Sequence, residues 1–159
     1  MTNYAGITVH GRDGRLQLLV EVKNKWGMPT TWAAKMRRNI YAHGELPHVP
    51  FFMLALPDVF CLWKERSGNM VEPTYQIDPR SFLKSYYEKA IVAPGRISGE
   101  RLELIVSAWL HQVTQTDAPK FLDEDSRGWL VESGLFDAIR GGRAAAGTTQ
   151  TLPIAQRIG

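Results

Sequence analysis

The sequence predicts an α/β domain with a small, mainly antiparallel β-sheet flanked by helices and a helical C-terminal half. Short apolar runs separated by turn residues occupy residues 5–64, which is typical of strands. Beyond Tyr75 the apolar residues recur at helical spacing. The length of 159 residues suits a single domain, and an apolar content of 44% is enough for a hydrophobic core.

The first predicted element is a β-hairpin formed by residues 5–9 and 16–23. Asp13-Gly14 suits the positive φ angles of a two-residue turn between these strands. This register gathers the apolar side chains on one face, through the pairs Val9 with Leu18, Ile7 with Val20, and Ala5 with Val22. The polar side chains fall with Leu19 on the opposite face, which carries Thr8, His10, Gln17, Glu21 and Lys23.

A helix and two further strands are expected after the hairpin. Residues 32–43 should form a helix that ends at Gly44 and packs on the sheet through Trp32, Met36 and Ile40. The apolar runs 51–56 and 59–64 are separated by Pro57-Asp58 and should pair as strands.

The remainder of the chain is expected to be helical. Asp78 is a predicted N-cap before Pro79, opening a helix to about residue 90, and Ser98 caps the next helix. The buried stripe of that second helix is predicted to be Leu102, Ile105, Val106, Trp109, Leu110 and Val113. A last helix should span 127–139. The expected organisation is a core at 1–66, a helical extension of the same domain at 67–140 and a disordered tail at 141–159.

Composition suggests a cytoplasmic protein. The first residues lack the basic head and apolar run of an export signal, and no segment approaches the roughly 18 consecutive apolar residues of a membrane span. The single cysteine, Cys61, lies in an apolar run and is predicted to be a core residue. A net charge of +3 is compatible with an acidic partner. The histidines show no metal-ligand spacing; they are His10, His43, His48 and His111.

The hairpin ending in Glu21-Val22-Lys23, the basic helix after it and the next strand resemble the core of the PD-(D/E)XK superfamily, the restriction-endonuclease-like nucleases. The likeness covers residues 5–64. It implies Mg²⁺-dependent hydrolysis of phosphodiester bonds, with DNA as the favoured substrate. By this match, Glu21 and the backbone carbonyl of Val22 would hold Mg²⁺, and Lys23 would position or activate the attacking water.

The sequence departs from this family pattern in two ways. Gly6 falls opposite Glu21, where the family has an acidic ligand, and a four-residue loop would put Tyr4 there instead. Asp13 would lie at the turn, roughly 25 Å from Glu21 at about 3.3 Å per residue, and Asp58 is interpreted as a turn residue. The family's preceding helix and strand are also missing, so the core is either trimmed or completed by a partner protein or a second copy.

A basic arc on the predicted helix, formed by Thr31, Lys35 and Arg38, is the candidate nucleic-acid surface. Lys25 and Arg37 are further candidates, and a solvated helix face is the alternative. Two functions therefore remain open. One is a Mg²⁺-dependent nuclease, and the other is a nuclease-fold module that binds nucleic acid or a protein without catalysis and needs no cofactor.

Overall fold

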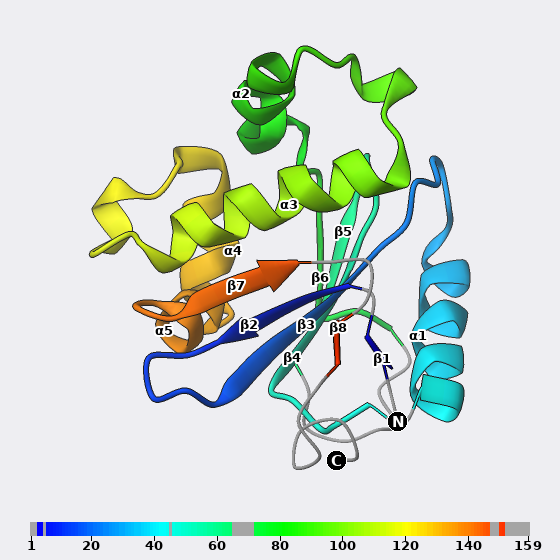
Figure 1. Ribbon diagram of the computed structural model, residues 1–159, viewed down its shortest axis with the longest axis horizontal. Helices are drawn as coiled ribbons and strands as arrows, with labels where there is room; N and C mark the ends of the chain where they lie inside the picture. The colour runs from blue at the N-terminus through cyan, green and yellow to red at the C-terminus, as the bar shows by residue number, and fades with distance from the viewer. Residues whose placement is uncertain (1–2, 5, 45, 65–71, 147–149, 152–159) are drawn as a thin grey trace.

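The computed structural model describes residues 3–4, 6–44, 46–64, 72–146 and 150–151. Within them, a six-stranded sheet has the order β6-β5-β4-β3-β2-β7 (Figure 1). Its strands are β2 (Ile7–His10), β3 (Leu16–Val22), β4 (Phe51–Ala55), β5 (Phe60–Lys64), β6 (Tyr75–Ile77) and β7 (Arg143–Ala146). The short strands β1 (Asn3–Tyr4) and β8 (Gln150–Thr151) form a separate pair.

Helices cover both faces of the large sheet (Figure 1). They are α1 (Thr30–Gly44), α2 (Arg80–Ala90), α3 (Gly99–Thr114), α4 (Glu124–Glu132) and α5 (Leu135–Ile139), with 3₁₀ turns at Pro94–Arg96 and Pro119–Phe121. All ladders among the described strands are antiparallel except β3–β4. The predicted fold class is therefore confirmed.

The β2–β3 hairpin has the predicted register but a different turn. Ile7 pairs with Val20 and Val9 with Leu18, and a bulge follows Val9. The Gly11 amide then donates to the Arg15 carbonyl at 2.8 Å, which leaves a three-residue loop that includes Gly14 at φ 84°. The two-residue turn was wrong because a left-handed glycine also closes a three-residue loop with a bulge.

The four-residue alternative was also wrong. Tyr4 pairs with Gln150 of β8 instead of facing Glu21. The observed register, continued by one residue beyond Ile7–Val20, places Gly6 opposite Glu21.

A crossover through α1 joins β3 to the parallel strand β4. As expected, α1 packs on one sheet face through Trp32, Met36 and Ile40, over a cluster that includes Phe52 and Trp63. β4 pairs antiparallel with β5, which confirms the second predicted strand pair. The sheet thus carries Glu21 and Lys23 toward the layer occupied by α1, since Leu19 on the same face packs against that layer.

The other face is covered by α2 to α5. The predicted stripe of α3 is buried throughout, and the Ser98 hydroxyl accepts a hydrogen bond from the Arg101 amide at 3.2 Å. The predicted helix at 127–139 is divided in two, because Gly134 has φ 86° between α4 and α5. A left-handed glycine at this position ends a helix.

The expected disordered tail was wrong at residues 143–146 and at 150–151, which form the strand β8. The longer of the two ordered segments is 143–146. These residues form β7, which pairs with the edge of β2 opposite β3. Figure 1 shows β7 between β2 and α3. Gly142 permits this approach, because a Cβ there would collide with the carbonyl oxygen of His10. The tail prediction for 147–149 and 152–159 lies outside the described residues.

Candidate functional site

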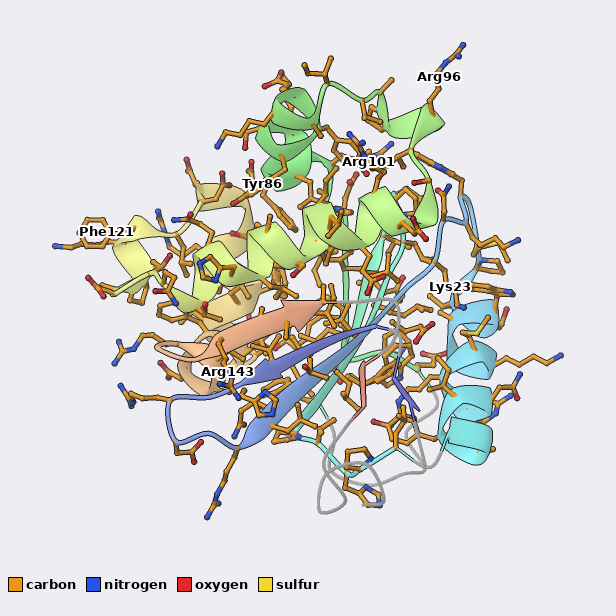
Figure 2. The ribbon with its side chains drawn as sticks, viewed as in Figure 1. Lys23, Tyr86, Arg96, Arg101, Phe121 and Arg143 are labelled. Atoms are coloured by element: carbon orange, nitrogen blue, oxygen red, sulfur yellow. The ribbon has the colours of Figure 1, made fainter. Side chains whose placement is uncertain are left out.

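Glu21 is the second-last residue of β3. Lys23 directly follows the strand, where the chain leaves the sheet toward α1 (Figure 2). Glu21 is in register with Leu54 of β4, and the Lys23 amide donates to the Ala55 carbonyl at 3.1 Å. The Lys23 ammonium nitrogen is 3.2 Å from Glu21 Oε2, with side chains 41% and 18% exposed respectively. The two charged groups of the motif therefore neutralise each other.

The residues around Glu21 do not fit a Mg²⁺ ion. Continuing the β2–β3 register by one residue places Gly6 opposite Glu21, and glycine has no side chain to contribute. No group of three or more histidine, cysteine, aspartate or glutamate residues in the described part of the chain is placed to hold a metal. Mg²⁺ favours several oxygen ligands in an octahedron, and Glu21 offers one carboxylate that is already paired with Lys23.

Asp13 and Asp58, the aspartates that precede and follow the Glu21-Val22-Lys23 motif in the sequence, have structural roles. Asp13 accepts a hydrogen bond from the Arg15 amide at 3.0 Å within the hairpin turn, at the opposite end of β3 from Glu21. Asp58 lies in the β4–β5 turn, as predicted, and accepts a hydrogen bond from the Gly27 amide at 3.0 Å. Asp58 thereby fastens the loop between β3 and α1.

Lys25 is exposed on that same loop. Besides the contact at Gly27, the loop is held by Asn24, whose side-chain amide donates to the Ile97 carbonyl at 2.7 Å. The loop is therefore fixed on both sides of Lys25, although its side chain projects into solvent.

The predicted basic arc of α1 is exposed as expected, with Thr31, Lys35 and Arg38 on the solvent side. Thr31 and Arg38 are seven positions apart, or about 10 Å along the helix axis at roughly 1.5 Å per residue. Arg37 does not belong to this surface, because it is only 3% exposed. Its guanidinium carbon lies 5.0 Å from the Tyr41 ring centroid and 5.4 Å from that of Trp63.

The C-terminal part of α1 borders a hollow of about 600 Å³ that the sequence did not indicate. Arg38 and Tyr41 line it from the helix, and His48 lines it from the following loop. His48 also lines a second hollow, of about 680 Å³, together with Lys64. The feature of the sequence that could have drawn attention to His48 is its place as a polar residue between two prolines, Pro47 and Pro50.

Cys61 is a core residue, as predicted, and is 1% exposed. Burial and the negative charge of Asp58 raise the pKa of its thiol from 9.0 to about 11. A buried, protonated thiol is a poor nucleophile. Cys61 is therefore a weak candidate nucleophile at neutral pH.

Comparisons with protein-family models, curated protein sequences and solved structures gave no significant match. In addition, no helix among the residues described is both long enough and apolar enough to cross a lipid bilayer. The interpretation of the site therefore depends on its own residues and on the strand topology around them.

Proposed function

We propose that this chain is a nuclease-like domain that binds nucleic acid without cleaving it. The resemblance to the PD-(D/E)XK core is supported by the order of elements around the Glu-Val-Lys motif. The motif ends β3, β2 is its antiparallel neighbour, and α1 leads to the parallel strand β4. This is the hairpin, helix and strand that the sequence pattern suggested.

The ion pair between Glu21 and Lys23, opposite Gly6, carries the non-catalytic part of the proposal. Metal-assisted phosphodiester hydrolysis needs a fixed cation that orients water and stabilises charge on the phosphate. A single carboxylate whose charge is offset by an ammonium group 3.2 Å away is a weak ligand set for Mg²⁺. The proposal therefore requires no cofactor.

The binding surface consists of Lys25, Lys35 and Arg38, which are exposed on the α1 side of the molecule. Cations on a nucleic-acid-binding protein neutralise phosphates and release condensed counterions, which supplies affinity without sequence selectivity. Because Lys23 offsets the charge of Glu21, that carboxylate repels a phosphate backbone less than an isolated one would. We favour DNA as the ligand.

Purified protein should not cut plasmid or single-stranded DNA in Mg²⁺ or Mn²⁺ above the background of the Glu21→Ala and Lys23→Ala variants. The physical reason is the incomplete ligand set at Glu21. Product formation on gels over several hours is the measurement. Robust cleavage that disappears in both variants would instead establish a metal-dependent nuclease.

DNA affinity should depend on Lys35 and Arg38. Replacing both with glutamine should weaken binding to unrelated sequences equally and flatten the plot of log affinity against log salt by somewhat under two units, at about 0.9 per contact on duplex. The helix should persist, because glutamine is a good helix former and neither residue belongs to the buried stripe. Binding titrations at several salt concentrations provide the measurement.

The matched control for this experiment is Arg15→Gln with Lys84→Gln, which removes two exposed cations away from α1. The control should leave the salt slope unchanged. Two results would contradict the nucleic-acid function: unaltered affinity in the folded Lys35 and Arg38 variant, or no measurable wild-type affinity at low salt.

A further inference from the structure

The two hollows beside His48 adjoin at the end of the sheet where β4 begins and β5 ends. Phe51 and Lys64 are in register there, so the loop entering β4 lies beside the end of β5. The first hollow, of about 600 Å³, is lined by Arg38, Tyr41, Leu46 and His48, among others. The second, of about 680 Å³, includes Phe51 and Lys64 with His48. Both volumes fall in the range of about 300–1,000 Å³ that is typical of ligand pockets.

The loop 46–50 holds His48 between the hollows. Pro47 and Val49 are buried while His48 is exposed, so successive residues alternate between core and solvent. Proline fixes its own φ and restricts the preceding residue to extended backbone. Because Pro47 and Pro50 impose this on residues 46 and 49, and because Pro47 and Val49 are buried, the backbone on both sides of His48 is restricted.

The wall of the first hollow is also held by core contacts. The Tyr41 ring centroid lies 5.5 Å from that of Phe52 at 59°, and the Arg37 guanidinium carbon is 5.0 Å from the Tyr41 centroid. Phe52 is fully buried and Arg37 nearly so. This side of the hollow is therefore preformed.

The charges in both hollows favour an anion. Arg38 lines the first and Lys64 lines the second, and neither lining includes a carboxylate among the described residues. Arg38 also belongs to the proposed nucleic-acid surface on α1. The hollows thus continue that surface around the end of the sheet.

We infer that the nucleic acid bound by this domain is single-stranded, with phosphates near Arg38 and Lys64 and unstacked bases in the hollows beside His48. This inference rests on the proposed function and adds the substrate class. A duplex keeps its bases stacked inside and presents a regular backbone that cannot enter such hollows. A single strand can turn its bases outward to contact aromatic and imidazole rings while its backbone follows the cations.

The test compares two fluorescein-labelled probes by anisotropy at about 50 mM salt: an oligothymidylate of about 15 nucleotides and a duplex of about 15 base pairs. The wild-type protein should bind the single strand about tenfold more tightly, as expected from the stacking of one base. His48→Ala combined with Lys64→Gln should remove most of this preference and leave duplex affinity within about twofold. The matched control, His111→Ala with Lys84→Gln, changes the same residue types on α3 and α2 and should retain the preference.

Several results would overturn the inference. Equal wild-type affinity for both probes would overturn the inference and leave the proposed function standing. Equal weakening of binding to both probes by the His48 and Lys64 variant would have the same consequence. Competition by polyglutamate as effective as that by unlabelled oligothymidylate would also overturn it, because the hollows would then bind a polyanion that has no bases. Absence of binding to either probe would overturn both the inference and the proposed function.

Discussion

At the scale of single residues, the contact between Lys23 and Glu21 has more consequence for chemistry than for stability. The Lys23 side chain is 41% exposed, and ion pairs in such surroundings contribute about 1 kcal/mol or less because water screens them. The ion pair matters for chemistry because Lys23 occupies the Glu21 carboxylate, which the family resemblance would assign to a metal ion. Arg37 was a candidate phosphate-binding residue, but its guanidinium is buried against Tyr41 and Trp63.

Cys61 should make stability depend on pH in the alkaline range. Burial and Asp58 raise the pKa of its thiol from 9.0 to about 11, so the unfolded chain loses this proton at lower pH than the folded protein. The contribution is therefore fully present below about pH 9 and is lost as pH rises through about 11. Urea unfolding at a series of pH values should show a shallower alkaline decline in Cys61→Ala than in the wild type.

The tyrosines provide the internal control for this comparison. Burial also raises the pKa values of Tyr86 and Tyr87, but these groups are present in both proteins and their contributions should cancel. Identical pH profiles for the wild type and Cys61→Ala would show that the thiol is not protected as the structure indicates.

At the scale of elements, α1 and the two segments that flank it position every candidate binding residue except Lys64, which ends β5. The loop before α1 carries Lys25, the helix carries Lys35 and Arg38, and the loop after it carries His48. Both loops are restrained, the first by Asn24 and Asp58 and the second by its prolines. The side chains are thus presented by one crossover between two parallel strands.

The C-terminal end of α2 contains a strained residue that offers an element-level prediction. Ile91 caps this helix at φ 55° and is 91% exposed. A β-branched residue in the left-handed region is unfavourable by about 1–3 kcal/mol, and glycine there is not, although glycine loses more entropy on folding. Ile91→Gly should therefore raise the free energy of unfolding by about 1 kcal/mol in urea titrations.

Leu104→Gly is the matched control for that substitution. Leu104 is 63% exposed but lies inside α3, where glycine is unfavourable by about 1 kcal/mol. The two variants should shift stability in opposite directions. Destabilisation by both would mean that Ile91 makes a contact worth more than its strain.

At the scale of the whole molecule, β7 near the C-terminus pairs with β2 of the first hairpin. β7 pairs with β2 from Ile7–Ala146 to His10–Arg143, and α3 lies alongside β7 (Figure 1). A partner protein or second copy is therefore not required at this edge of the sheet. An unpaired edge of β2 would be a template for association.

Gly142→Ala should separate β7 from β2, because the added methyl group would collide with the backbone of His10. We expect a loss of about 2–3 kcal/mol in the free energy of unfolding, as for other overpacked sites, together with larger species in size-exclusion chromatography. Gly128→Ala, in α4 with open space around its Cβ position, should be neutral or stabilising by up to about 1 kcal/mol. Unchanged stability and size in Gly142→Ala would contradict the tight β2–β7 contact.

Local periodicity in the amino-acid sequence was enough to predict the first hairpin and the buried face of α3. The two-residue alternation of Ile7, Val9, Leu18 and Val20 determined the faces and register of the hairpin, and the helical spacing of the α3 apolar residues determined its buried stripe. A shift of one residue in the strand register or along the helix would bury polar side chains, so few other arrangements are possible. The position of Gly6 opposite Glu21, and with it the doubt about catalysis, followed from this register.

Contacts between segments far apart in the chain could not be predicted in this way, because they depend on how the whole domain packs. Residues 143–146 carry no strand pattern of their own and become β7 because the edge of β2 supplies hydrogen-bond partners. Arg37 of α1 is buried where its guanidinium lies over Trp63 of β5. His48 lines the same hollow as Lys64 because β4 and β5 pair at Phe51. Such contacts join residues far apart in the chain, and they depend on the packing of the whole domain rather than on the order of neighbouring side chains.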